Sequence, residues 1–472
     1  MAPRPPSPTL PPLPRQWQKG TDLKPVPEHH KEQHRLRGTP RGLQCAHATA
    51  NQRGLTAMHV IVIGAGVTGT TTAWFLRDAG LSVTLLDAAD LPAQGASAAN
   101  GGMLHASHAE PWNAPGVGWD LLRHIGRADS PLLLRPRALP GLVPWGIEFL
   151  WNSRGGRFER NTLVNARLAE YSLRELRALQ QELALDFDFA ESGILKIFQD
   201  PQSLEKNRNA SRRMADVGVH FEDWDAARVA AEEPALEPIA HRLCGALFFP
   251  GDAIGNAATF TRELTAVAER AGVRWRPNTT VTGWRRFQGR INGVETSRGP
   301  MAADAVVLAS GFAAPGLLRR LGIRLPVAPV KGYSLTLHLN GASRLRLPII
   351  DDANKVVLTP LGSRLRLAGT AEFTGADLRM NVSRAENVLA QCRRTLPWLP
   401  EHVDPDTMEP WAGLRPMSAR GTPILGPTPV PGLYLNTGAG HLGWTFACGS
   451  AGLVRDSILG RTPALPLEPF LP

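Results

Sequence analysis

The sequence predicts an α/β fold in which a domain with a parallel sheet is interleaved with an α+β domain built on an antiparallel sheet. Three observations predict it. A strand, a glycine-rich turn, a helix and another strand follow in order between residues 58 and 87. Strands with antiparallel character run from 332 to 369, and a second strand, glycine turn and helix begin at 433. Strands that alternate with helices favour a parallel sheet, whereas consecutive strands favour an antiparallel one.

The first element is a βαβ unit of the Rossmann-like type. The apolar run 59–63 predicts a buried parallel strand. Residues 64–69 then turn the chain into a helix that continues to Leu76, and residues 81–86 predict a second strand. This order is typical of a dinucleotide-binding site.

Each glycine of the turn has a predicted role. Gly64 permits the tight turn, Gly66 lets the backbone approach a pyrophosphate, and Gly69 lets helix and strand pack closely. The phosphates would lie at the positive end of the helix. Asp87, 18 residues after Gly69, suits a carboxylate that accepts hydrogen bonds from a ribose 2′-hydroxyl and disfavours a 2′-phosphate. By itself the unit fits NAD and FAD equally.

The middle of the chain supplies the rest of both sheets. Residues 95–102 are rich in small side chains, which suits backbone that passes close to a ligand. The spacing of apolar residues predicts a helix at 160–183. Further strands are predicted at 193–198, 219–222, 332–339, 356–359 and 365–369. Strands at 273–275, 280–284 and 291–296 predict a three-stranded excursion that returns to the parallel sheet at 305–311.

The C-terminal block repeats the order of strand, turn and helix. Residues 433–436 predict the strand, 438–443 the turn and 445–459 the helix, so a second helix N-terminus would point at the cofactor. We expect the nucleotide domain to comprise 58–105, 250–320 and 421–461, the substrate domain 106–249 and 321–420, and a tail 462–472.

Composition excludes several classes of protein. The net charge is +10, but residues 1–57 hold nine Lys and Arg against three Asp and Glu, which leaves +4 for the other 415 residues. That is too little for a nucleic-acid-binding protein. No run of about 18 apolar residues predicts a membrane-spanning helix. Cys45, Cys244, Cys392 and Cys448 lack CxxC spacing, which argues against disulfides and zinc and favours a reducing, cytoplasmic setting. No metal is predicted.

Residues 1–57 are basic and Pro-rich without a periodic apolar pattern, which predicts disorder. They lack the apolar core of a secretory signal. We expect Met58 to be the natural start, because a nucleotide-binding strand normally lies near an N-terminus. A Pro-rich ligand for an SH3-like groove is the alternative.

Together these pieces resemble the flavin-dependent D-amino-acid oxidase superfamily, and most closely its bacterial D-amino-acid dehydrogenase small subunits. The resemblance covers about residues 58–461 and rests on the glycine turn together with SAANGG at 97–102, PWNAPG at 111–116, PVKGYSLT at 329–336, WAGLRPM at 411–417 and the segment 436–449. It implies FAD and oxidation of the Cα–N bond of a D-amino acid. The C-terminal glycine turn also favours FAD over NAD, because a flavin that stays bound can be held by two distant parts of a chain.

The resemblance implies a set of residues at the cofactor. They are Val60, Ile61, Val62, Ile63, Gly64, Ala65, Gly66, Val67, Thr68, Gly69, Thr70, Thr71, Thr72, Ala73, Trp74, Asp87, Ser97, Asn100, Gly101, Gly102, Val281, Gly311, Gly438, Gly440 and Gly443.

Three residues are predicted at the reacting centre. Arg415, between Gly413 and Pro416, resembles the anchor of the substrate carboxylate, for which a planar bidentate cation is suited; an ordinary surface arginine is the alternative. Tyr333 is a candidate second contact or a core aromatic. His441 is a candidate acid or base, although hydride loss from a neutral amine requires none. In the loop where relatives carry Gln, Ser and Tyr, this chain has Met103, His105 and His108, so substrate choice is open.

The resemblance also implies a quinone or another electron carrier as acceptor. The apolar stretch 131–151, which contains Arg135 and Arg137, fits either peripheral contact with the inner face of the cell membrane or a partly buried connector. Two other functions stay open: an oxygen-using flavin amine oxidase acting on glycine, sarcosine or a D-hydroxyproline-like imino acid, and a non-catalytic FAD-carrying subunit. Oligomeric state is not predicted.

Overall fold

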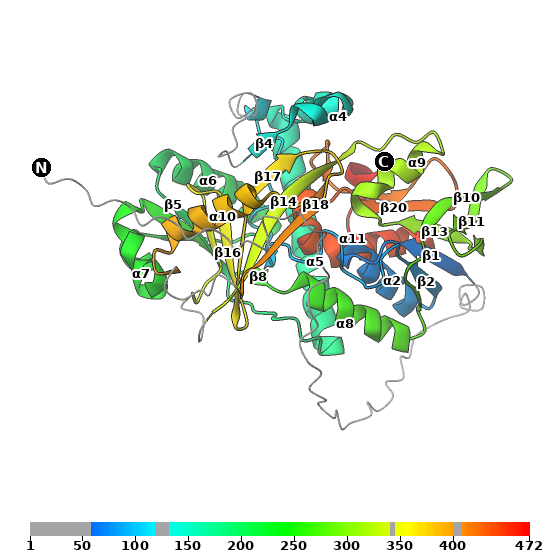
Figure 1. The fold of residues 1–472 in the computed structure, drawn as a ribbon, viewed down its shortest axis with the longest axis horizontal. Helices are drawn as coiled ribbons and strands as arrows, with labels where there is room; N and C mark the ends of the chain where they lie inside the picture. The colour runs from blue at the N-terminus through cyan, green and yellow to red at the C-terminus, as the bar shows by residue number, and fades with distance from the viewer. Residues whose placement is uncertain (1–57, 119–131, 340–344, 400–406) are drawn as a thin grey trace, which may run out of the picture.

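Two sheets lie side by side along the longest axis of the molecule (Figure 1). The computed structural model describes residues 58–118, 132–339, 345–399 and 407–472. The predicted leader 1–57 lies outside the described residues. One sheet is mostly parallel and the other mostly antiparallel. The predicted α/β fold class is therefore confirmed.

The parallel sheet has six strands in the order β19-β20-β13-β1-β2-β9. Its strands are β1 (His59–Ile63), β2 (Ser82–Leu86), β9 (Arg274–Arg276), β13 (Ala305–Leu308), β20 (Leu433–Thr437) and the antiparallel edge strand β19 (Ile424–Pro427). The central strands β1 and β13 are buried on both faces, as expected where both faces of a parallel sheet are covered.

The two faces of this sheet are covered differently. Helices α2 (Val67–Asp78), α8 (Ala257–Arg270) and α11 (Gly443–Leu459) pack around Val60 and Val62 on one face. On the other face, Ile61 and Ile63 meet α9 (Ala314–Arg319) and the small sheet formed by β10 (Val281–Phe287), β11 (Arg290–Thr296) and β12 (Met301–Ala302). The alternation of side chains along β1 therefore supplies both cores.

Two details differ from the sequence predictions. The strand predicted at 273–275 belongs to the parallel sheet as β9, and the third strand of the excursion is β12. The helix predicted at 160–183 begins earlier, as α5 (Gly155–Leu183), and packs against α11 although its sequence lies in the segment assigned to the substrate domain. Ser172 accepts a hydrogen bond from the Gly449 backbone there, at 2.9 Å.

The antiparallel sheet follows the order β18-β14-β17-β16-β15-β5-β7-β6, with β4 added beside β17. Its strands are β4 (Leu132–Leu134), β5 (Ile194–Phe198), β6 (Glu222–Trp224), β7 (Gly245–Phe249), β14 (Val327–His338), β15 (Ile349–Asp351), β16 (Val356–Leu361), β17 (Arg364–Phe373) and β18 (Glu409–Ser418). The strand predicted at 219–222 is displaced to β6. One face packs against α10 (Val382–Thr395) and α7 (Ala226–Glu232), and residues of this sheet such as Val357 and Ala368 line the cavity described below.

Substitution of Gly69 tests how closely helix α2 packs against the first glycine turn. A Cβ atom on Gly69 would lie 1.8 Å from the carbonyl oxygen of Gly64, so Gly69→Ala must push helix α2 away from the turn. We expect a loss of about 1–3 kcal/mol or more, measured as a thermal midpoint several degrees lower. Gly146→Ala is the control, because this helical position has open space around it and should be neutral or slightly stabilising. An unchanged midpoint for Gly69→Ala would contradict the close packing.

Candidate active site

A large cavity is lined by residues from both sheets. Its volume is about 1940 Å³, roughly twice the upper end of ordinary ligand pockets at about 1,000 Å³. Its wall includes the carboxyl end of β1, the first turn of α2, the loop before α11, and the exposed faces of β16, β17 and β18. A ligand larger than a single small molecule is therefore accommodated.

The first turn of α2 forms one wall of the cavity. Gly64 has φ +107°, and a Cβ there would lie 2.6 Å from the Ala309 carbonyl oxygen, so only glycine fits. The Ser97 hydroxyl accepts a hydrogen bond from the Val67 backbone at 3.0 Å. A Cβ on Gly66 would approach that hydroxyl to 3.3 Å. The first turn carries no acidic residue, so its positive end is open to an anion.

Asp87 lies at the same wall and holds the turn in place. One carboxylate oxygen accepts a hydrogen bond from the Ala65 backbone at 2.6 Å, and the other accepts one from Ala89 at 2.8 Å. Each oxygen retains a second acceptor position. Asp87 can therefore stabilise the turn and bind a ribose hydroxyl at once.

The loop before α11 forms a second wall. Gly438 and Gly440 have φ values of +73° and +59°, which favour glycine. A Cβ on Gly440 would lie 2.9 Å from the Met417 sulfur. The Asn436 side chain donates to the Thr72 hydroxyl at 3.0 Å. This bond links β20, which leads into the second glycine turn, to α2, which follows the first.

Only part of the predicted cofactor set lines the cavity. The lining residues are Ile63, Gly64, Gly66, Val67, Thr68, Asp87, Ser97, Asn100, Gly101, Gly102, Val281, Gly311, Gly438, Gly440 and Gly443. The remaining predicted residues lie outside the lining: Val60, Ile61, Val62, Ala65, Gly69, Thr70, Thr71, Thr72, Ala73 and Trp74. They form the interior of β1, the back of the turn and the packed face of α2, so we propose a structural contribution for them.

Arg415 lies on a shelf made by two paired glycines. Gly332 on β14 is opposite Gly413 on β18. A Cβ on Gly332 would lie 2.1 Å from Nη1 of Arg415, and a Cβ on Gly413 would lie 2.1 Å from the indole of Trp411. The absence of side chains at this pair lets the guanidinium and the indole lie flat against the sheet.

The guanidinium of Arg415 has unused binding capacity. It is removed from bulk solvent but partly open to the cavity, and burial lowers its pKa to about 10. Its Nη1 atom is buried without a hydrogen-bond partner among the described residues. The Trp112 ring lies 5.6 Å from the guanidinium carbon. Such a group is suited to a carboxylate, which offers two acceptors in one plane.

Three histidines lie in the same cavity wall and are neutral. Burial lowers the pKa of His441 to about 3 and that of His105 to about 4, and it holds the pKa of His108 well below its usual range. His441 stacks on Trp112 with ring centroids 5.6 Å apart. A histidine with so low a pKa is a poor general base near pH 7. The acid or base role predicted for His441 is therefore not supported by its environment.

The loop that carries His105 and His108 is held from behind by Asp252. Its carboxylate accepts hydrogen bonds from the Ser107 hydroxyl at 2.5 Å and from the Ala106 backbone at 3.0 Å. The two imidazoles are thereby fixed against the cavity.

Tyr333 does not join Arg415. Successive side chains of a strand point to opposite faces, and Gly332 already faces Arg415. Tyr333 instead packs among the core residues on the α10 side, where its hydroxyl donates to Glu372. Glu372 in turn pairs with Arg135 at 2.7 Å. Of the two possibilities left open for Tyr333, a second substrate contact and a core aromatic, the structure places it in the core.

Sequence reasoning did not assign a role to several lining residues. Trp112 and Trp411 occur in the quoted motifs, and their place beside Arg415 follows from strand pairing that the sequence does not display. Lys196 also lines the cavity. It interrupts an otherwise apolar strand, Ile194–Phe198, and that interruption is the signal that could have marked it.

Comparison with known proteins decides the family. Residues 59–457 match the model described as FAD dependent oxidoreductase. The chain belongs to this family. The D-amino acid dehydrogenase of Paramagnetospirillum magneticum is 41% identical over 413 residues, 87% of this chain and 97% of the relative. That of Dechloromonas aromatica is 42% identical over 420 residues, 88% of this chain and 100% of the relative.

A solved structure supports the same fold. Glycine oxidase from Geobacillus kaustophilus superposes with a TM-score of 0.69 at 24% identity, covering 88% of this chain and 98% of that chain. The resemblance drawn from the motifs is confirmed, and FAD is the cofactor of the family. The open first turn of α2, the cradle at Gly64 and Gly66, and the size of the cavity fit a flavin dinucleotide. Among the described residues, no group of three or more His, Cys, Asp or Glu could hold a metal ion.

The space that Gly332 leaves for the guanidinium can be tested without substituting Arg415. Gly332→Ala places a methyl group where the guanidinium lies, so we expect at least tenfold weaker binding of a nonreactive carboxylate such as benzoate, with FAD content unchanged. The perturbation of the flavin spectrum on titration measures it. Gly283→Ala is the matched control in another strand, because its Cβ would meet Glu295 only at 3.5 Å. Equal affinities for Gly332→Ala and the unmodified protein would exclude the shelf.

Proposed function

We propose that this protein oxidises D-amino acids to 2-oxo acids and ammonia, with FAD as the immediate oxidant. The observation that carries the proposal is the guanidinium of Arg415, which lines the cavity that fits FAD and has a buried nitrogen without a partner among the described residues. The curated relatives named D-amino acid dehydrogenase support the substrate class.

The side chains of the cavity bind and orient the substrate. When bound, FAD accepts the hydride that leaves Cα. Arg415 binds the α-carboxylate through two parallel hydrogen bonds and thereby fixes Cα, since positioning supplies much of the rate in such reactions. The neutral histidines add no positive charge that would compete for the carboxylate. The substrate amine loses a proton to solvent, and water then hydrolyses the resulting imino acid to the 2-oxo acid and ammonia.

An anaerobic flavin-bleaching screen tests this function. D-amino acids should bleach the flavin absorbance and L-amino acids should not. Arg415→Ala should raise KM for D-amino acids at least 100-fold and retain FAD, because the charge-assisted pair with the carboxylate is lost. Arg298→Ala, at an exposed turn position, is the control and should behave as the unmodified protein. A normal KM for Arg415→Ala would rule out the anchor.

The same screen separates the two other functions. Stoichiometric hydrogen peroxide released in air with D-alanine would indicate an oxygen-using amine oxidase. A flavin that no D-amino acid bleaches would indicate a non-catalytic FAD-carrying subunit.

For the acceptor, we propose a quinone or another lipophilic carrier at a membrane surface, reached beside α4 (Leu139–Asn152). One end of the cavity is lined by Leu132, Phe149 and Phe373, and Phe149 comes from the inner side of α4. The outer side of the same helix exposes large apolar side chains: Leu139 (40% exposed), Val143 (55%), Ile147 (66%), Leu150 (46%) and Trp151 (48%). We call these five residues the outer face of α4.

Basic residues flank the outer face. Arg137 precedes the helix, and Arg154 and Arg157 follow it. The guanidinium of Arg154 lies 3.6 Å from the centre of the Trp151 ring. An apolar helix face bordered by arginines suits an interface with anionic lipid. Among the described residues, none of the helices is long and apolar enough to cross a bilayer.

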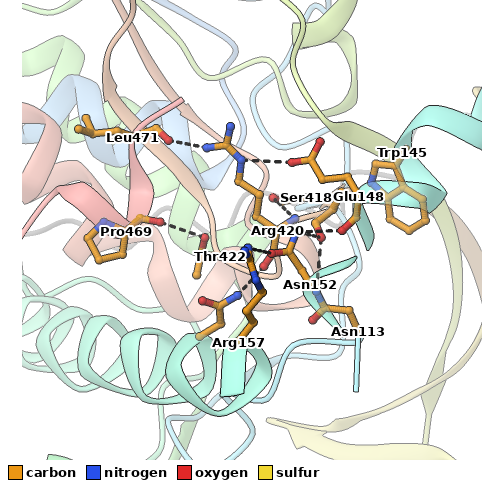
Figure 2. Close-up of polar contacts among 12 residues, drawn as sticks. Asn113, Trp145, Glu148, Asn152, Arg157, Ser418, Arg420, Thr422, Pro469 and Leu471 are labelled. Carbon is orange, nitrogen blue, oxygen red and sulfur yellow. Dashed lines mark hydrogen bonds and ion pairs between the residues drawn. The ribbon is translucent and has the colours of Figure 1, made fainter. Parts of the chain in front are cut away.

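The inner side of α4 is hydrogen-bonded to the chain that continues from Arg415. Trp145 donates to the Met417 carbonyl at 2.9 Å, and Asn152 donates to Ala419 at 3.4 Å. Arg420 lies 3.4 Å from Glu148 and also donates to the Leu471 carbonyl at 2.5 Å (Figure 2). The outer face is thus presented on a helix fixed to the active-site strand β18.

Substitution of the outer face tests the membrane proposal. The double variant Val143→Asp with Ile147→Asp should bind at least tenfold less to vesicles of phosphatidylcholine with phosphatidylglycerol, because two apolar anchors are lost. Sedimentation with the vesicles measures it. Phe287→Asp is the control, since Phe287 is 64% exposed on β10, outside the outer face. Equal sedimentation of all three proteins would refute this surface.

A further inference from the structure

The loop 97–102 is held by its backbone carbonyls. Those of residues 99–101 each accept a hydrogen bond from a side chain of the antiparallel sheet. The donors, in that order, are the Ser334 hydroxyl at 2.6 Å, the Arg366 guanidinium at 2.8 Å and the Thr359 hydroxyl at 2.7 Å. They come from the neighbouring strands β14, β17 and β16. The sheet therefore fixes three peptide groups of the loop in succession.

Arg366 lies on the face of the sheet that carries this loop. Leu365 and Leu367, its neighbours in the sequence, pack in the core on the α10 side. Strand alternation places Arg366 on the opposite face. Thr359 is its register partner on β16, so two of the three donors stand side by side beneath the loop.

The direction of the carbonyls decides where the next N–H groups point. In a trans peptide, the C=O of one residue and the N–H of the next point in opposite directions, and the described backbone contains no cis peptide bond. Because the carbonyls of Ala99 and Asn100 are turned toward the sheet, the N–H groups of Asn100 and Gly101 point away from it. Asn100 and Gly101 both line the cavity. The loop can therefore present two backbone donors to a bound ligand.

Arg366 is costly for the fold at this position. It is only 5% exposed, and burial lowers its pKa to about 10, so it is charged at neutral pH. Glu409 and Asp188, the carboxylates that act on it from a distance, pair with other residues. Its Nε atom is buried without a partner among the described residues. Since a buried charge with so little compensation destabilises a fold, its presence points to a role at the loop.

The bond from Arg366 also affects the peptide that it holds. A cation that donates to a carbonyl makes a charge-assisted hydrogen bond, which is stronger than a neutral one. Hydrogen bonds in a chain polarise one another, so the N–H on the far side of the same peptide, that of Gly101, becomes a better donor. The neutral hydroxyls of Ser334 and Thr359 do this less.

We propose that Arg366 is a positioning residue of the FAD site: by holding the Asn100 carbonyl, it fixes and polarises the peptide whose N–H group, that of Gly101, is presented to the cofactor. Ser334 and Thr359 hold the two flanking carbonyls. Arg366 itself stands behind the loop and acts through it. This inference goes beyond the proposed oxidation, because it concerns the cofactor and holds whichever substrate is oxidised.

Release of FAD from the full-length holoprotein tests this role. Arg366→Met should release FAD about tenfold faster or more, because a hydrogen bond to a charged group is lost. The rise of flavin fluorescence after dilution into flavin-free buffer measures it. The absorption spectrum of the flavin that stays bound should shift. Arg366→Lys, which keeps the charge and a donor, should restore most of the retention.

Arg364→Met is the matched control. Arg364 lies two residues earlier on β17, and its guanidinium donates to Asp188 at 2.8 Å and not to the loop. This variant should release FAD at the normal rate. Thr359→Val, which keeps the shape but removes the hydroxyl held by Gly101, should accelerate release about two- to fivefold.

Thermal unfolding of the FAD-free protein separates positioning of the loop from support of the fold. Arg366→Met should leave the midpoint unchanged or raise it, since a poorly compensated buried charge is replaced by an apolar side chain. A midpoint several degrees lower would overturn the proposal, because Arg366 would then stabilise the fold itself. Normal FAD release by Arg366→Met or by Thr359→Val would overturn it as well.

The outcomes also separate this inference from the proposed function. If FAD release changes as expected but no D-amino acid bleaches the flavin, the proposed function fails and the role of Arg366 stands. If D-amino acids bleach the flavin and Arg366→Met releases FAD normally, the function stands and the role of Arg366 is overturned.

Discussion

The guanidinium of Arg415 is a positive charge removed from bulk water. Much of the surrounding structure serves to accommodate it. A charge removed from water is destabilising unless something compensates it, and here the described protein leaves one nitrogen without a partner. The sheet accommodates the group by having no side chain at Gly332 and Gly413. The neighbouring imidazoles are themselves too poorly solvated to carry a proton. Under the function proposed above, a carboxylate bound to this guanidinium recovers the stability given up here, and the binding energy is concentrated at the group that orients Cα.

The parts of the site that the sequence predicts well depend on residues close together in the chain. The roles of Gly64 and Gly69 and the place of Asp87 follow from one strand, one turn and one helix, and the structure shows the contacts each requires. The second glycine turn is also visible in the sequence, because it repeats the same local order. The hydrogen bond between Asn436 on β20 and Thr72 on α2, the elements that flank the two turns, is a contact between distant residues that no local pattern contains.

What the sequence could not settle concerns the faces of strands and the registers in which they pair. Tyr333 is next to a glycine of the site, yet it belongs to the other face of the strand. A register shift between Gly332 and Tyr333 breaks the regular pairing with β17, so a motif read along one strand cannot show what lies across from it. The predicted cofactor set extends beyond the cavity lining for a related reason. It included the interior of β1 and the packed face of α2, since a motif does not distinguish residues that touch a ligand from residues that hold those in place.

Helix α4 has one side in contact with the active-site strand and the other exposed. Trp145 and Asn152 hold backbone carbonyls only two and four residues beyond Arg415, while Ile147 and Val143 touch nothing that the structure describes as core. The two sides of this helix should therefore tolerate different substitutions. The outer positions should be free to exchange one apolar residue for another, because the lipid surface that we propose for them requires no complementary shape. The inner positions hold the chain that continues from Arg415. A change of side-chain length there would displace the strand that carries Arg415.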